Sequence, residues 1–216
     1  SILTDIGHSL SQIDIDSIKY HDFLIEYPFS DIVDLDWKNL LDKPPLNSSS
    51  QTRQELNYLA NITSTRTQTE TNLVYNIDNL PEYYLLEVIN QKKLNSYNNQ
   101  IREFYNIIKP ILWNVKYLFN RPRPEQLAKL YGINIQLLRT TTHYTPAYPS
   151  GHTVYAALYE KILSYYHPQY TSLFKRAVKQ TMLGRELQGV HYPSDNLASV
   201  SLVDKLFNAL YKKVLL

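Results

Sequence analysis

The feature that most constrains the fold is a run of apolar residues with helical spacing over Ile101–Phe119. Apolar side chains fall at 101, 104, 105, 108, 111, 112, 115, 118 and 119, so they form one stripe along an α-helix. Pro110 lies inside this run and predicts a kink. The sequence Arg121-Pro122-Arg123-Pro124 predicts the end of the helix, because a residue before proline disfavours the α conformation.

The rest of the chain carries helical signals as well. Two prolines in the segment 42–50 forbid a helix, and the serines after them favour an N-cap for a polar helix over Thr52–Thr65. Residues 68–79 stay undecided, and no segment alternates convincingly with the period of a strand. Four further helices are expected, over Pro81–Gln91, Gly151–Tyr166, Pro168–Leu187 and Pro193–Lys212.

The sequence therefore predicts an all-α fold in a single domain over residues 1–216. Residues 81–216 are expected to form the helical bundle, with a less regular N-terminal portion, residues 1–80, packed on it. A length of 216 residues suffices for a sizeable core, and 44% hydrophobic against 19% charged residues indicates a globular chain.

Composition excludes several classes of partner and site. A net charge of +2 without a dense Lys/Arg stripe argues against nucleic acid, and the absence of cysteine excludes disulfides and thiolate metal sites. The sequence contains no run of about 18 apolar residues, so we expect no transmembrane span. The N-terminus lacks signal-peptide features, but a precursor could have lost them, so the compartment (cytoplasmic, secreted or periplasmic) and assembly into a homo-oligomer stay open.

Three charged residues occupy positions where the helical pattern predicts a core. Lys116 follows Leu112 by four residues, Arg185 follows Met182 at helical spacing, and Asp195 shares a predicted helix face with apolar residues. A buried charge needs a partner, because leaving it unpaired costs several kcal/mol. Internal ion pairs are one explanation: Arg185 with Asp195, and Lys116 with a glutamate. A bound anion is the other.

Two further segments contain residues suited to anion chemistry. Ser150, Gly151 and His152 precede an apolar-periodic helix, whose N-terminus presents free N–H groups that favour an anion. An ordinary serine N-cap with an exposed histidine explains the same pattern. His191 lies four residues before Asp195, a spacing at which the carboxylate can hold one imidazole nitrogen and leave the other free as a nucleophile.

Together these residues resemble the three signature motifs of the type 2 phosphatidic acid phosphatase (PAP2) superfamily. That superfamily includes bacterial class A acid phosphatases, lipid phosphatases and vanadium-dependent haloperoxidases. The resemblance covers about residues 100–212 and implies a helical bundle with the active site between core helices. It rests on Lys116-x6-Arg123-Pro124, Pro149-Ser150-Gly151-His152 and Arg185-x5-His191-x3-Asp195.

The resemblance also implies a role for each motif residue. His191 would attack phosphorus and form a phosphohistidine, Asp195 would orient it, and His152 would protonate the leaving oxygen. A set of phosphate-binding residues would hold the non-bridging oxygens, with no metal ion required: Lys116, Arg123, Ser150, Gly151 and Arg185. The sequence departs from the family pattern at Gly184, where serine is usual. We expect the missing hydroxyl to tune activity and the glycine to loosen the end of the helix.

Three functions fit these motifs. The favoured one is a soluble, metal-independent phosphatase that acts on small phosphomonoesters and is inhibited by vanadate. The second is a haloperoxidase that holds vanadate as its cofactor, although such enzymes are much larger chains. The third is a catalytically weak module that binds phosphate or a phosphorylated ligand, and the retained histidines and aspartate argue against it.

Overall fold

The computed structural model describes residues 13–21 and 35–216 of the chain, and the segments 1–12 and 22–34 lie outside the described residues. Within the described part the fold is all-α, as the sequence predicts, and it contains no strand. The N-terminal portion contributes α2 (Ser50–Ser64) and α3 (Gln68–Asp78). Ser49 caps α2 by accepting from the backbone N–H of Thr52 (3.1 Å), which confirms the predicted serine cap after the prolines.

The longer helices follow the predicted segments closely. They are α4 (Tyr83–Lys92), α5 (Asn98–Phe119), α7 (Gly151–Tyr166), α8 (Thr171–Leu187) and α9 (Pro193–Leu215). Pro110 lies inside α5, which continues to Phe119 and ends where Asn120 adopts a left-handed conformation (φ 49°). Two details differ from the expectation. A short helix, α6 (Pro124–Ala128), begins directly at the second proline, and the segment expected to start α8 forms a separate 3-10 turn over Pro168–Tyr170.

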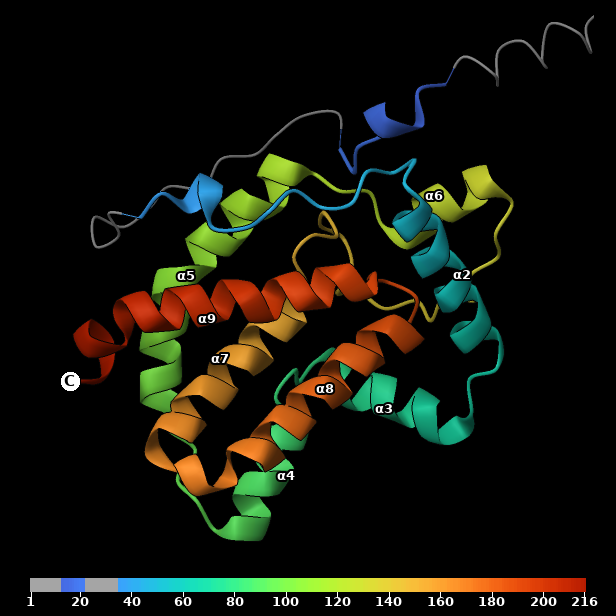
Figure 1. Ribbon diagram of the computed structural model, residues 1–216. Helices are drawn as coiled ribbons and strands as arrows, with labels where there is room; N and C mark the ends of the chain where they lie inside the picture. Colours follow the sequence, from blue (N-terminus) through green and yellow to red (C-terminus); the bar gives the residue numbers. More distant parts are fainter. Residues whose placement is uncertain (1–12, 22–34) are drawn as a thin grey trace, which may run out of the picture.

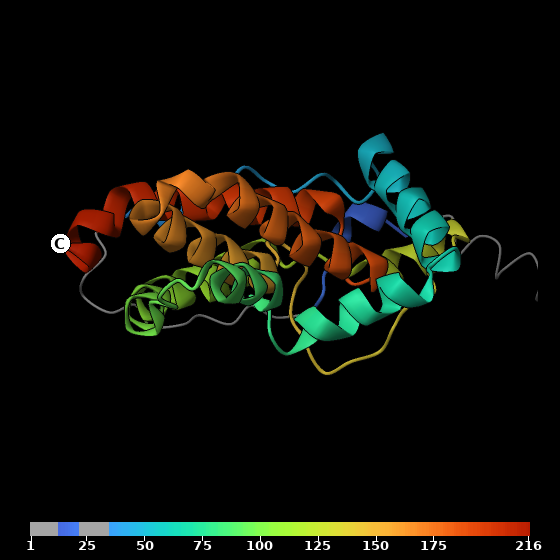
Figure 2. The ribbon, with the colours of Figure 1, turned by 90° about the horizontal axis from the view of Figure 1, so that it is seen from below.

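The bundle has two layers. In Figure 1 α9 crosses over α7, and α8 runs beside α7. Figure 2 shows α4 and α5 on the opposite side of this α7–α9 layer. The main core lies between the layers and contains fully buried apolar side chains from each long helix, such as Phe104, Leu158, Phe174 and Leu202. Each such side chain contributes about 1.5–3 kcal/mol through burial.

A second, smaller apolar cluster joins the N-terminal helix α2 to the bundle. Leu56 and Leu59 of α2 pack with Leu127 of α6 and with Tyr192, the residue that precedes α9. Both clusters reach the start of α9, the first through Ala198 and the second through Tyr192.

Candidate active site

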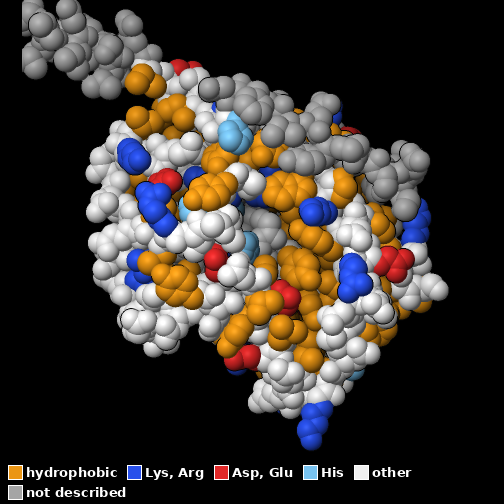
Figure 3. Space-filling view, turned by 180° about the vertical axis from the view of Figure 1, so that it is seen from behind, with side chains coloured by type: hydrophobic (Ala, Val, Ile, Leu, Met, Phe, Trp, Pro, Cys, Tyr) orange, Lys and Arg blue, Asp and Glu red, His pale blue; other side chains and the backbone are white. Residues whose placement is uncertain are grey.

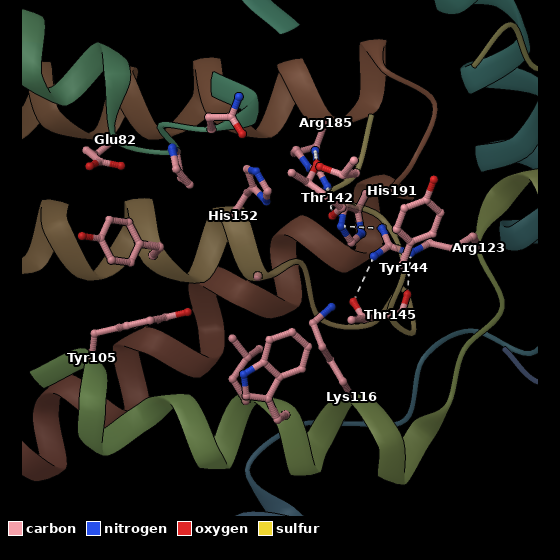
Figure 4. Close-up of a pocket in the computed structure, with 17 residues that line it drawn as sticks. Glu82, Tyr105, Lys116, Arg123, Thr142, Tyr144, Thr145, His152, Arg185 and His191 are labelled. Carbon is pink, nitrogen blue, oxygen red and sulfur yellow. Dashed lines mark hydrogen bonds between the residues drawn. The ribbon is translucent and has the colours of Figure 1, made fainter. Parts of the chain in front are cut away.

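One cavity of about 460 Å³ collects most of the predicted site residues. Figure 4 shows them facing one another from different elements, and the view from behind in Figure 3 shows a hollow in which histidine side chains are visible. Six predicted residues line this cavity: Lys116, Arg123, Gly151, His152, Arg185 and His191. The remaining two, Ser150 and Asp195, are fully buried and do not line it.

The first motif places two cations at the cavity without carboxylate partners. Lys116, in the last turn of α5, donates from Nζ to the carbonyl of Pro146 (2.8 Å). Arg123, in the connection to α6, donates to the carbonyls of Thr145 (2.7 Å) and Val190 (2.9 Å). Neither forms an ion pair with any described residue, so the predicted lysine–glutamate pair is absent from this part of the chain.

Burial governs the protonation of these two cations. It lowers the pKa of Arg123 to about 10 and the pKa of Lys116 well below its usual value, and repulsion from Arg123 lowers the pKa of Lys116 further. Both groups would gain from an anion in the cavity, because an anion replaces the solvation that they have lost.

The second motif forms the N-terminus of α7. Ser150 caps the helix, its Oγ lying 3.4 Å from the backbone nitrogen of Thr153, as in the ordinary serine cap considered from the sequence. A Cβ built on Gly151 would lie 3.8 Å from Cε of Lys116, at normal contact distance. Packing therefore does not demand glycine at 151, but a methyl group there would enter the space between the lysine and the helix N-terminus.

His152 has a defined tautomer. Its Nε2 lies 2.6 Å from the backbone carbonyl of Asp78, the last residue of α3. A carbonyl only accepts, so Nε2 carries the hydrogen and Nδ1 is the nitrogen free to exchange a proton with a ligand. Burial and then repulsion from Arg185 lower the pKa of His152 well below its usual value, so these surroundings favour the neutral imidazole.

The third motif begins with Arg185 at the end of α8. Its Nη1 donates to Gln188 Oε1 (2.6 Å), and its Nη2 donates to the carbonyl of Thr142 (3.2 Å). The nearest carboxylate oxygen belongs to Asp78, 3.6 Å from Nη1. Burial, with repulsion from Arg123, lowers the pKa of Arg185 to about 9. Its Nε is buried with no acceptor among the described residues, so the guanidinium is incompletely satisfied.

His191 is held at both ring nitrogens. Its Nδ1 donates to Asp195 Oδ2 (3.0 Å), and its Nε2 accepts from Arg123 Nη1 (2.9 Å). The carboxylate thus fixes the tautomer whose lone pair, on Nε2, faces the cations of the cavity. Burial and repulsion from Arg123 and Arg185 lower the pKa of His191 well below its usual value, which keeps it neutral.

Asp195 pairs with Arg121, not with Arg185 as the ion-pair explanation assumed. Arg121 Nη1 lies 2.6 Å from Asp195 Oδ1, and its guanidinium stacks 3.8 Å from the ring centre of Tyr192. Burial raises the pKa of Asp195 to about 6, and Arg121 opposes that rise. Because Asp195 pairs with Arg121, it does not compete with a ligand for Arg185. Arg185 lines the cavity and Arg121 does not.

The N-terminal helix α2 completes this arrangement. Glu55 accepts from the backbone N–H (2.6 Å) and hydroxyl (2.9 Å) of Ser194, and it lies 3.6 Å from Arg121. The carboxylate therefore satisfies a free N–H in the first turn of α9 and balances the arginine behind Asp195.

Gly184 has a packing role that differs from the expectation. It lies inside α8, which continues to Leu187, so it does not loosen the helix end. A Cβ at 184 would lie 2.7 Å from Cδ2 of Leu73 and 2.8 Å from Cδ1 of Ile77, both on α3. The glycine lets α3 approach α8. The next residue after Ile77 is Asp78, which contacts both His152 and Arg185, so this close approach also bears on the site.

Replacing Gly184 by the serine usual in the family is expected to lower the free energy of unfolding by about 1–3 kcal/mol, because overpacking outweighs the improved helix propensity. Urea unfolding of Gly184→Ser measures the loss. Ile77→Ala, which opens space beside the new Cβ, should cost less stability in the Gly184→Ser background than in the wild type, so the two losses should be less than additive. Additive losses in the double variant, or a more stable Gly184→Ser, would contradict this account.

Sequence reasoning missed Asp78, Arg121 and Glu55. Asp78 stands in a segment whose helical character was undecided, and Glu55 is one of many polar residues of α2. Arg121 carried one signal, its position in the first motif two residues before Arg123, but spacing alone does not reveal that the two arginines face different partners.

Comparison with known families agrees with this geometry. The PAP2 superfamily model matches residues 104–203, a range that includes all three motifs. A comparison with curated proteins gives no match. In the part of the chain that the structure describes, no helix is long and apolar enough to cross a membrane, and no group of three or more His, Cys, Asp or Glu side chains could hold a metal ion.

Proposed function

Residues 104–203 belong to the PAP2 superfamily, whose members typically hydrolyse phosphate esters, and from this we propose that the protein is a phosphomonoester hydrolase that acts through a phosphohistidine. One observation carries the proposal. His191 stands between Asp195 and Arg123, with its Nε2 lone pair at a cavity that also holds Lys116 and Arg185. A neutral, oriented nucleophile beside buried cations suits attack on a phosphate.

In the first step Arg123 Nη1 transfers its hydrogen bond from His191 Nε2 to a non-bridging phosphate oxygen. The freed Nε2 lone pair then forms a bond to phosphorus while the bond from phosphorus to the leaving oxygen breaks. His152 gives its proton to that oxygen. The cations stabilise the negative charge on the non-bridging oxygens, and their positions are set in advance by hydrogen bonds to the protein. The proton on Nδ1 of His191 stays on the imidazole, held by Asp195.

In the second step water attacks the phosphohistidine and His152 takes a proton from that water. Phosphate leaves, and both histidines return to their initial states. The first step needs a protonated His152, whereas burial and the cations favour its neutral form. A bound phosphate dianion would offset the repulsion from Arg185, Arg123 and Lys116 and would raise the pKa of His152.

A panel of phosphate esters with orthovanadate as inhibitor tests this function. Vanadate imitates the trigonal-bipyramidal transition state, so it should block hydrolysis of p-nitrophenyl phosphate, and activity should survive EDTA because the cations replace a metal. Halide oxidation with vanadate and peroxide tests the haloperoxidase alternative. Phosphate binding without turnover of any ester, or turnover that vanadate does not affect, would contradict the proposal.

A further inference from the structure

The cavity extends well beyond the residues assigned to the phosphate. Figure 4 shows Glu82 and Tyr105 at one end of it and Arg123 and His191 at the other, with His152 between them. The end away from the cations is lined by Glu82 at the start of α4, Tyr105 of α5 and Tyr155 of α7. We call these three residues the distal subsite. No step of the proposed hydrolysis uses them.

The direction of the reaction places the leaving group in this subsite. An in-line displacement needs the nucleophile and the leaving oxygen on opposite sides of phosphorus. His191 is the nucleophile, and His152, which would protonate the leaving oxygen, lies toward Glu82 and Tyr105. Whatever is attached to the leaving oxygen therefore extends toward the distal subsite.

Among the described residues the carboxylate of Glu82 accepts a hydrogen bond only from its own backbone N–H. Glu82 occupies the N-cap position of α4, yet its side chain makes no capping hydrogen bond. It forms no ion pair with any described residue. The side chain is partly buried, and burial raises its pKa. A half-buried carboxylate without a counterion is costly unless a ligand supplies one.

The two tyrosines give this carboxylate an aromatic surrounding. The rings of Tyr105 and Tyr155 meet edge to face, with centroids 5.0 Å apart and an angle of 85° between their planes. Aromatic rings beside a carboxylate are the chemistry that binds an ammonium group, most of all a quaternary one. A leaving group with its own carboxylate or second phosphate would be repelled by Glu82.

We propose that the distal subsite binds an ammonium group on the leaving alcohol, so the preferred substrates are phosphomonoesters of amino alcohols, such as phosphocholine. This inference rests on the proposed function, because it uses the direction in which the leaving group departs. The two ends of the cavity then match the substrate: cations hold the phosphate, and Glu82 with the tyrosines holds the positive charge.

A matched pair of substrates measures this preference. 3,3-Dimethylbutyl phosphate has the shape of phosphocholine with carbon in place of the charged nitrogen. The wild-type protein should show kcat/KM about tenfold higher for phosphocholine, the range expected for a partly desolvated ammonium against aromatic rings and a carboxylate. Glu82→Gln should bring the ratio close to one while changing the rate on the neutral ester little. Tyr155→Leu should lower the ratio, and Tyr105→Phe, which keeps the ring, should not.

The failures of the two proposals can be told apart. If p-nitrophenyl phosphate is hydrolysed in a vanadate-sensitive way but the wild-type ratio is near one, the subsite assignment is wrong and the hydrolase stands. If no ester is hydrolysed, calorimetric binding of the two matched esters to the intact chain decides. Tighter binding of phosphocholine, lost in Glu82→Gln, supports the subsite, and equal binding overturns it. A thermal melt of each variant confirms that it folds.

Discussion

His191→Ala is expected to lower kcat for p-nitrophenyl phosphate by at least about 10³-fold, since loss of the nucleophile removes the covalent route entirely. The side chain is 1% exposed and touches both Asp195 and Arg123, so no other imidazole takes its place. Steady-state kinetics measure the effect. Rapid alkaline quenching with a radiolabelled ester should trap phosphate on the wild-type protein and not on the variant.

A matched control is available for this experiment. His143 is also a buried histidine near the site, but it does not line the cavity. His143→Ala should therefore keep most of the activity, which separates loss of the nucleophile from loss of a buried ring. Turnover close to that of the wild type in His191→Ala would rule out the phosphohistidine mechanism.

Arg121→Met is expected to lower the free energy of unfolding by about 3–5 kcal/mol, because it leaves the carboxylate of Asp195 buried without its ion-pair partner. Asp195 is fully buried, and the pair joins it to Arg121 at 2.6 Å. Urea unfolding measures the loss. Adding Asp195→Asn to Arg121→Met should recover much of it, because the stranded charge is gone.

Arg123→Met is the matched control, two residues along the same segment. Arg123 has no carboxylate partner among the described residues, so Arg123→Met should lower the free energy of unfolding less than Arg121→Met does. Because Arg123 lines the cavity, its replacement should lower the activity more. The two arginines thus separate structural pairing from ligand binding. Equal losses of stability in the two variants, or additive losses in the Arg121→Met/Asp195→Asn double variant, would contradict the assignment.

The sequence was most informative where local physics decides the structure. The apolar stripe predicted α5, prolines marked its end, and a serine after prolines marked the start of α2. The fixed spacings inside the motifs also identified six of the residues that line one cavity. Residues on one helix or in one tight connection keep the same relative positions whatever the rest of the chain does. Their arrangement can therefore be predicted from the local sequence.

Partners distant in sequence could not be read in the same way. One of the two explanations for the buried charges pairs Asp195 with Arg185, whereas Arg121 is its partner, and only the packing of three segments settles which arginine is near enough. The contact of His152 with the carbonyl of Asp78 joins residues 74 positions apart and involves a backbone atom, for which no residue type is diagnostic. Gly184 was interpreted as a lost hydroxyl, because its neighbour on α3 leaves no trace in the local sequence.

The links from α2 and α3 bear on what the smallest working unit of this protein is. A fragment beginning at residue 81 would retain every motif residue. It would lack the Glu55 carboxylate that holds Ser194 and balances Arg121, and the Asp78 carbonyl that sets the tautomer of His152. A fragment that contains all three motifs is therefore not expected to be catalytically competent. A design that transplants the motif helices must include α2 and α3 as well.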